Sequence, residues 1–240
     1  LYRKAGELKR AVLAAGDARE FRLNDRDYSL YLIFMEDSTR TRESFRSASK
    51  FLGVRTNLFD TATSSFNKNE SMSDAVKMLF GYADESCFVI RSKLEGVCRW
   101  LEDSLGRYAD SSGRPRPSFI NAGDGKHEHP TQEFLDEYSF HEQLGFSDER
   151  IHIALTGDLY HGRTVHSKAD GLRLFREVEV DLVAPDPLGM PASYVRRMRD
   201  NGFRVNSYES LDEYLASGHV APIWYFTRLQ LERMGEAVLE

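Results

Sequence analysis

The chain has 240 residues, 41% of them hydrophobic and 29% charged, which is typical of a soluble globular protein with one large domain or two ordinary ones. Its formal net charge of −6 gives no global reason to expect a nucleic-acid partner, so any anion site must be basic locally. No apolar run is long enough for a bilayer span and no charged-then-apolar leader is present, so we expect a cytosolic protein without a membrane anchor.

The first half alternates between helical and strand-like stretches. Apolar residues at helical spacing and the stop signals Gly53 and Gly145 define the helices, with Pro130 suited to a first turn. The predicted helices cover residues 1–15, 39–52, 72–79, 94–108 and 130–144, and the predicted strands cover 31–35, 54–59, 87–90 and 118–120. Two cysteines, Cys87 and Cys98, lack CxxC spacing and are expected to be structural thiols.

The second half repeats the alternation. Predicted strands cover 151–155, 179–184, 203–206 and 223–226, separated by helices near 163–175, 191–200 and 210–216. The pattern predicts an α/β protein with two domains, each a parallel sheet covered by helices on both faces. The polar stretch at 145–150 marks the boundary, giving domains 1–145, including the connecting helix 130–145, and 146–240. The chain opens on Leu1 rather than Met and stops on an apparently unfinished helix over 231–240, so we expect a fragment or a chain with unobserved ends.

Polar clusters follow several strands, where open parallel sheets bind their ligands. The first is Glu36-Asp-Ser-Thr-Arg-Thr-Arg42, a strand-to-helix turn. This turn suits a phosphate for several reasons. It offers first-turn amides, the positive end of the helix dipole, the hydroxyls of Ser38, Thr39 and Thr41, and the guanidinium of Arg40 or Arg42. An ordinary helix cap with solvated arginines explains this segment equally well.

Three further clusters occupy comparable positions. In the stretch 121–132, His127 and His129 are spaced for a metal, but no further ligands can be placed. Two alternatives remain open: His129 has a hydrogen-bonding role, with Gln132 one turn on, or the loop has no function. The stretch 155–166 fails the GxGxxG spacing of dinucleotide sites, and its Arg163 suits a carboxylate or phosphate. Arg228 and Gln230 follow the last strand, where surface arginines are usually just solvated.

Four motifs, taken together and in order, resemble the catalytic chains of aspartate carbamoyltransferases. They are STRTR (38–42), HPTQ (129–132), GDLYHGRTVHS (157–167) and TRLQLER (227–233). The resemblance extends over almost the whole sequence. STRTR alone would indicate only the wider aspartate/ornithine carbamoyltransferase superfamily. HPTQ, where ornithine enzymes typically carry HPCQ, and TRLQ point to aspartate as the acceptor.

The resemblance implies that the protein transfers the carbamoyl group of carbamoyl phosphate to the amine of L-aspartate, giving N-carbamoyl-L-aspartate and phosphate in pyrimidine biosynthesis, without a metal or organic cofactor. It assigns carbamoyl phosphate to the first domain and aspartate to the second. The implied carbamoyl phosphate ligands are Ser38, Thr39, Arg40, Thr41, Arg91, His129 and Gln132, of which Arg40, Thr41, Arg91 and His129 are implied to be catalytic. The implied aspartate ligands are Lys68, Arg163, Arg228 and Gln230, with Ser64 and Lys68 supplied by a neighbouring subunit.

The same resemblance implies a homotrimer, and some family members also carry zinc-binding regulatory chains, separate or fused. In the family a leucine-proline loop and terminal helices follow the TRLQ region, and nothing here corresponds to them. A transcarbamoylase for another amino acid such as ornithine, or an inactive relative serving as a binding subunit, remain the alternatives. A Rossmann-type oxidoreductase fits the coarse pattern but lacks its glycines.

Overall fold

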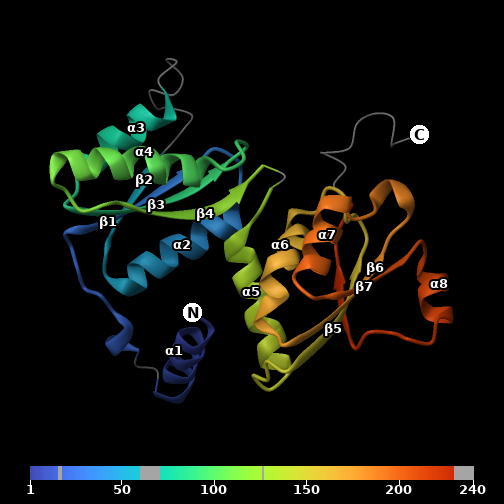
Figure 1. Cartoon of the computed structure of the whole chain (residues 1–240). Coiled ribbons are helices and arrows are strands. Elements are labelled where there is room, and N and C mark those ends of the chain that lie inside the picture. The colour runs from blue at the N-terminus through green and yellow to red at the C-terminus, as the bar shows by residue number, and fades with distance from the viewer. Residues whose placement is uncertain (16–17, 60–70, 126, 230–240) are drawn as a thin grey trace. The chain divides into compact units, whose positions relative to one another are not determined.

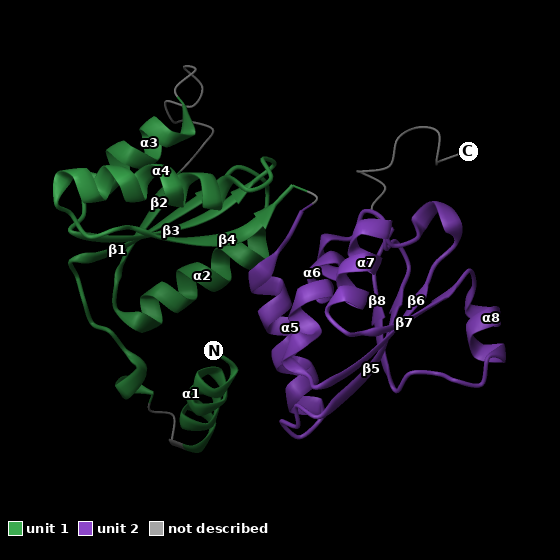
Figure 2. Ribbon diagram, viewed as in Figure 1, with its two compact units in different colours: residues 1–125 green, residues 126–240 purple. Residues whose placement is uncertain are grey.

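The computed structural model describes residues 1–15, 18–59, 71–125 and 127–229. The chain divides into two compact units, residues 1–125 and 126–240, coloured separately in Figure 2. Each unit is built around its own four-stranded sheet. The expected α/β architecture with two parallel sheets is therefore confirmed.

The first unit has the strand order β2-β1-β3-β4, and every neighbouring pair is parallel. The central strand β1 pairs with both β2 and β3, and nearly all of its residues are buried because both faces of the sheet are covered. The elements of this unit are α1 (Tyr2–Ala15), η1 (Arg19–Phe21), β1 (Tyr28–Phe34), α2 (Thr39–Leu52), β2 (Arg55–Phe59), α3 (Met72–Phe80), β3 (Glu85–Ser92), α4 (Val97–Ser112) and β4 (Ser118–Asp124).

Alternation along β1 sends side chains into two cores. Tyr31 and Ile33 pack with buried residues of α3 and α4 on one face, while Leu30 and Leu32 pack toward α2 on the other. Figure 1 shows α3 and α4 on one side of this sheet and α2 on the other. This arrangement brings the carboxyl ends of β1, β3 and β4 to one edge of the unit.

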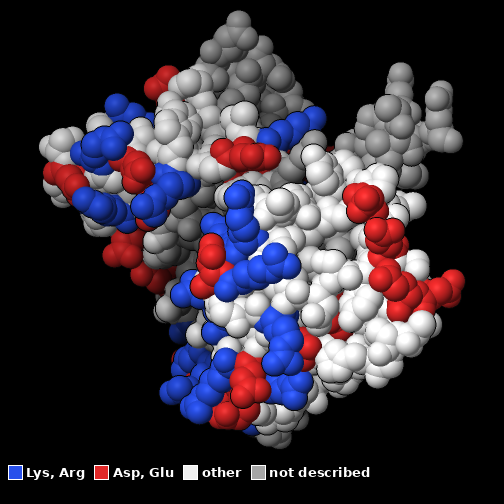
Figure 3. All heavy atoms as spheres, turned by 45° about the vertical axis from the view of Figure 1, so that its right-hand side comes forward, with Lys and Arg blue, Asp and Glu red and all other residues white. Residues whose placement is uncertain are grey.

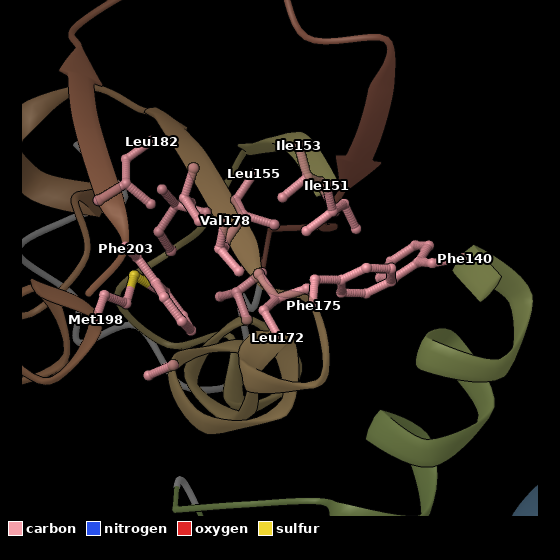
Figure 4. Packing of buried hydrophobic residues seen from close by; sticks show 14 residues of the cluster. Phe140, Ile151, Ile153, Leu155, Leu172, Phe175, Val178, Leu182, Met198 and Phe203 are labelled. Carbon is pink, nitrogen blue, oxygen red and sulfur yellow. The ribbon is translucent and has the colours of Figure 1, made fainter. Parts of the chain in front are cut away.

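The second unit has the strand order β7-β6-β5-β8, again with parallel neighbours. The elements of this unit are α5 (Pro130–Gln143), β5 (Arg150–Thr156), α6 (Arg163–Gly171), η3 (Leu172–Leu174), β6 (Glu177–Val183), η4 (Asp186–Leu188), α7 (Ala192–Asp200), β7 (Arg204–Tyr208), α8 (Leu211–Ala216) and β8 (Ile223–Phe226). Its main core lies between the sheet and the helices α5, α6 and α7, as Figure 4 shows for Phe140, Phe175 and Met198. The opposite face carries α8, whose Tyr214 is fully buried against Ala154 and Val183.

The division between the units differs from the domain boundary expected at residue 145. Helix α5 falls in the second unit because Phe140 joins its core and Glu133 pairs with Lys168 of α6. The polar stretch at 145–150 is instead the short turn that leads from α5 into β5, with Gly145 and Phe146 at positive φ. The predicted helix over 231–240 lies outside the described residues.

Within the described part of the chain, no helix is long and apolar enough to cross a membrane. On the left of the face drawn in Figure 3, lysine and arginine side chains lie among acidic ones, whereas a stripe on the right carries aspartate and glutamate side chains alone. Cys87 and Cys98 are free thiols, and burial raises the pKa of Cys87 to about 11 and that of Cys98 to about 12. Both sulfurs are therefore protonated near neutral pH, in line with a structural role.

Candidate active site

The turn from β1 into α2 presents an open helix start. Ser38 is the N-cap residue of α2, yet its side chain makes no capping hydrogen bond. By contrast, the hydroxyl of Ser71 accepts a hydrogen bond from the Asp74 amide, and that of Ser210 accepts one from the Glu213 amide. The ordinary serine cap is thus used at α3 and α8 but not at α2. The first turn of α2 also holds no acidic residue, so its amides are suited to an external anion.

Arg91 is the last residue but one of β3 and lies beside the end of β1, paired in register with Phe34. Its Nη1 donates a hydrogen bond to the carbonyl oxygen of Ala122 at 3.1 Å, and its Nε lies 3.6 Å from Oε2 of Glu36. The side chain is only 12% exposed. A largely buried guanidinium is therefore anchored between β4 and the segment that leads into α2, on the edge where the Ser38–Thr41 turn also lies.

In the second unit, His129 is the N-cap residue of α5 and is buried. Its Nδ1 accepts from the backbone amide of Gln132 at 3.4 Å and lies 3.2 Å from the hydroxyl of Thr131. An accepting Nδ1 assigns the ring proton of the neutral imidazole to Nε2. The helix start thus fixes the ring with Nε2–H as a donor, which suits a carbonyl oxygen.

Gln132 lies in the first turn of α5, and its carboxamide is oriented by Asp136. The Nε2 of Gln132 donates to Oδ1 of Asp136 at 2.9 Å. Because an ionised carboxylate only accepts hydrogen bonds, this contact fixes which end of the carboxamide faces Asp136. The carbonyl oxygen of Gln132 is then the end directed away from Asp136, and such an oxygen can accept from an NH₂ group.

Arg163 and Arg228 follow two strands whose ends are in contact. Arg163 begins α6 just after β5, and Arg228 follows β8, the neighbour of β5 in the sheet. The Thr227 amide donates to the Thr156 carbonyl at 2.8 Å. A Cβ on Gly162 would lie 3.7 Å from Thr227 Cγ2. The residues that immediately precede the two arginines are therefore neighbours at the carboxyl edge of this sheet.

Close backbone approach explains the glycine at the end of β5. Gly157 has a φ of 111°, and a Cβ there would lie 2.6 Å from the carbonyl oxygen of Thr227. A side chain at this position would push the end of β8 away from β5. Gly157 thereby allows the segments that carry Arg163 and Arg228 to approach each other closely.

The remaining expected site residues, Ser64, Lys68 and Gln230, lie outside the described residues. His127, considered as a metal ligand, has its Nε2 3.8 Å from a carboxylate oxygen of its neighbour Glu128.

Among the described residues, one group of three side chains brings metal-ligating atoms within 4.8 Å of one another, namely His152, Glu179 and His219. Glu179 already lies 3.1 Å from Arg150, 3.7 Å from Arg204 and 3.0 Å from His219. Burial would raise the pKa of the Glu179 carboxyl, but the hydrogen bond from His219 and the nearby positive charges lower it overall. Two arginines on the carboxylate oppose a divalent cation, so we interpret this group as an ion-pair network that ties the loop before β8 to the sheet.

Sequence reasoning missed three residues that support the site, Glu36, Asp136 and Lys168. Glu36 lies in the quoted turn, and its acidic character beside Arg91 is visible only once β1 and β3 are paired. Lys168 is fully buried, with Nζ 2.6 Å from Glu133 and 3.0 Å from Asp136. The signal that could have revealed this cluster is the spacing of Glu133 and Glu137, which places two acidic residues on one face of a helix.

Comparison with known proteins decides the family. Residues 1–142 match the family model described as "Aspartate/ornithine carbamoyltransferase, carbamoyl-P binding domain". An aspartate carbamoyltransferase catalytic subunit of Methanococcus maripaludis is 36% identical over 230 residues, which cover 92% of this chain and 70% of the relative. The chain belongs to the aspartate carbamoyltransferase family.

A protein of Thermotoga maritima named "Protein PyrBI" is more similar, at 56% identity over 243 residues. The match covers all of this chain but 46% of that protein, and 45% of a protein of the same name from Treponema denticola, so the chain spans about half the length of these relatives. The matched family model includes α5, which the structure groups with the second unit.

Solved structures agree with this membership. Aspartate transcarbamoylase of Trypanosoma cruzi in complex with N-(phosphonacetyl)-L-aspartic acid superposes with a TM-score of 0.79 at 32% identity, covering 99% of this chain and 70% of that one. The same enzyme in complex with carbamoyl phosphate and aspartate gives a TM-score of 0.76 at 31% identity, covering 97% and 68%. The two-sheet architecture described above is therefore the architecture of this family.

Proposed function

We propose that the complete protein transfers the carbamoyl group of carbamoyl phosphate to the amine of L-aspartate, giving N-carbamoyl-L-aspartate and phosphate in pyrimidine biosynthesis. The observation that carries the proposal is the meeting of the Arg163 and Arg228 segments at one sheet edge, through Gly162 and Thr227. Two carboxylates call for two guanidinium forks, because bidentate pairing fixes direction as well as charge. Ornithine has one carboxylate and a cationic side chain, so a second arginine would repel it.

The carbamoyl phosphate half of the proposal rests on the open start of α2 and on Arg91. The amides and hydroxyls of Ser38, Thr39 and Thr41, with Arg40, would bind the phosphate, and Arg91 would contact phosphate and carbonyl oxygen. His129 would donate from Nε2 to the carbonyl oxygen, and Gln132 would accept from the carbamoyl NH₂. Ser64 and Lys68 of a neighbouring subunit and Gln230 would complete the aspartate site.

The reaction in this proposal is an addition followed by an elimination. The aspartate nitrogen forms a bond to the carbamoyl carbon, the bond from that carbon to the bridging phosphate oxygen breaks, and the amine proton passes to the departing phosphate. Charge grows first on the carbonyl oxygen and then on phosphate, so fixed donors such as Arg91 and His129 lower the barrier. Holding both substrates in line supplies the remaining advantage.

Domain roles and assembly complete the proposal. Residues 1–145 would form the carbamoyl-phosphate-binding domain and 146–240 the part of the aspartate-binding domain present here, in a cytoplasmic enzyme. A lysine donated by a neighbour implies a homotrimer. The parts of the PyrBI relatives beyond the match leave room for a fused regulatory domain, while a separate zinc-binding regulatory chain is the other arrangement we consider. Native mass spectrometry of the complete protein would read both the subunit number and any second chain.

The test is turnover by the complete protein, measured with carbamoyl phosphate and either aspartate or ornithine. We expect phosphate release and N-carbamoyl-L-aspartate with aspartate and no citrulline with ornithine. Product formed with ornithine but not with aspartate would indicate an ornithine transcarbamoylase. Binding of carbamoyl phosphate without turnover of either amino acid would indicate an inactive relative that serves as a binding subunit.

A further inference from the structure

A buried ionic cluster lies directly behind Gln132, between α5, α6 and β8. Lys168 of α6 is fully buried, and its ammonium donates to Oε2 of Glu133 at 2.6 Å and to Oδ2 of Asp136 at 3.0 Å. The hydroxyl of Tyr225 on β8 donates to the same Oδ2 at 2.9 Å. Side chains of α6 and β8 therefore meet at one carboxylate of α5.

Asp136 has two oxygens with separate tasks. Oδ2 receives the Lys168 ammonium and the Tyr225 hydroxyl, while Oδ1 receives the Nε2 of Gln132 at 2.9 Å. Burial raises the pKa of Tyr225 to about 12, so its hydroxyl stays protonated and remains a donor. With Oδ2 occupied by two donors, the carboxylate plane is fixed, and Oδ1 is held toward Gln132.

Lys168 and Glu137 hold protons within this cluster. Burial alone would lower the pKa of Lys168, but the carboxylates of Glu133 and Asp136 raise it, so the cation persists. Burial first and Glu133 next raise the pKa of the fully buried Glu137 to about 9, so it retains a proton near neutral pH. Burial also raises the pKa of Glu133. A protonated Glu137 adds no negative charge beside Asp136, whose Oδ1 accepts from Gln132.

We propose that Lys168 and Asp136 are positioning residues that fix the carboxamide of Gln132, so that its carbonyl oxygen faces the NH₂ of carbamoyl phosphate. This inference rests on the proposed function. It also connects the two substrates, because Lys168 lies on the helix that begins with Arg163. A shift of α6 against α5 would move Arg163 relative to Gln132, and with them the aspartate carboxylate relative to the carbamoyl group.

The experiment compares two substitutions that each change one partner of Lys168. Asp136→Asn disrupts the hydrogen bonds that connect Lys168 through residue 136 to Gln132, at nearly constant side-chain volume. Glu133→Gln, the matched control, leaves those hydrogen bonds intact. We expect Asp136→Asn to raise the KM for carbamoyl phosphate and lower kcat, together by about 10–100-fold, as misplaced contacts do. Glu133→Gln should change both far less, with the KM for aspartate little altered in either variant.

A second pair of variants separates positioning from folding. Lys168→Met leaves the carboxyl groups of Glu133 and Asp136 without their cation and should lower stability. Lys168→Met combined with Glu133→Leu removes the Lys168–Glu133 pair together, which is often tolerated. Positioning predicts that the double variant regains stability while its KM for carbamoyl phosphate stays raised. Equal effects of Asp136→Asn and Glu133→Gln, or a stable double variant with wild-type KM, would overturn the inference.

The result can be told apart from a failure of the proposed function. Wild-type protein without turnover would remove the function, and a crystal structure of Asp136→Asn would still test positioning. We expect the Gln132 carboxamide to rotate in that variant. An unmoved Gln132 would contradict the inference whatever the activity of the wild type.

Discussion

Arg91 and Glu36 meet at the edge where two parallel strands end, with Nε of Arg91 3.6 Å from Oε2 of Glu36. The same guanidinium donates through Nη1 to the Ala122 carbonyl oxygen at 3.1 Å. Its planar fork therefore reaches two fixed points at once and keeps its remaining N–H groups in a defined plane. A lysine at this position would have one point charge to satisfy the same demands.

We predict that Arg91→Lys is nearly as damaging as Arg91→Ala. Both variants should lower kcat/KM for carbamoyl phosphate by about 10²–10³, the usual cost of losing a donor to developing charge. Steady-state kinetics at varied carbamoyl phosphate measures this. Arg114→Lys, which alters another arginine that donates to a backbone carbonyl, that of Ala83, is the control and should leave the kinetics unchanged. An active Arg91→Lys variant would remove the need for the fork.

The two serines at helix starts give a matched pair. Ser71→Ala should cost about 1 kcal/mol of unfolding free energy, because its hydroxyl caps α3. Ser38→Ala should change unfolding free energy by no more than about 0.5 kcal/mol, because its side chain does not cap α2. The same substitution should weaken carbamoyl phosphate binding, which calorimetry can measure. A large stability loss at Ser38 with unchanged binding would mean an ordinary cap.

For His129, we predict that its helix-capping role and its catalytic role can be separated by substitution. His129→Ala should lower turnover by about two to three decades, which corresponds to about 3–4 kcal/mol of barrier, while the protein remains folded. His129→Asn restores a side chain suited to capping but not the Nε2–H donor at the same reach. Turnover should stay low in His129→Asn although its melting temperature recovers. Near wild-type turnover in either variant would exclude the role of His129.

Arg163 and Arg228 should act on aspartate alone. We expect Arg163→Gln or Arg228→Gln to cost about 2–5 kcal/mol in kcat/KM for aspartate, because each leaves one carboxylate unpaired, with the KM for carbamoyl phosphate little changed. Arg204→Gln is a suitable control, since Arg204 begins β7 at the other end of the same sheet. If both KM values rose together in the Arg228 variant, the arginine would be serving the fold or the other substrate.

Glu137 should make stability depend on pH. Its pKa is about 9 in the folded protein against an ordinary value of 4.5, so between these pH values the folded state holds more protons than the unfolded state. The unfolding free energy should therefore fall with rising pH, by up to about 1.4 kcal/mol per unit from this group, and the loss should level off above its folded pKa. Glu137→Gln removes this slope. In denaturant titrations, the unfolding free energy of the variant should therefore rise relative to that of the wild type between pH 6 and pH 9.

The exposed Glu149 provides the control for this measurement. Glu149→Gln should follow the wild-type pH dependence. Parallel curves for Glu137→Gln and the wild type would show that Glu137 keeps no proton in the folded protein.

Much of the fold could be read from the sequence because both sheets are parallel. Their strands, such as β1, form short apolar runs buried on both faces, and the polar residues after them mark the strand ends. The boundary between units could not be read in this way. A polar turn at 145–150 looks like a linker, whereas the contacts that place α5 are a buried phenylalanine and an ion pair with α6.

Residues proposed to act on a ligand could be proposed from the sequence, whereas residues that act on one another could not. Serine, threonine and arginine at a helix start suggest an anion from local geometry alone. On α5, however, Phe134 and Leu135 are 45% and 59% exposed, whereas Glu137 is fully buried. Glutamate and lysine are normally assigned to the surface, so the network behind Gln132 requires knowledge of which helices pack together.

A competition between aspartate and ornithine shows which amino acid the protein carbamoylates. The complete protein would be given ¹³C-labelled carbamoyl phosphate with equal concentrations of aspartate and ornithine, and the labelled products would be followed by NMR. We predict the signal of N-carbamoyl-L-aspartate and none of citrulline. Label in citrulline, or label remaining in carbamoyl phosphate while it binds to the protein, would contradict it.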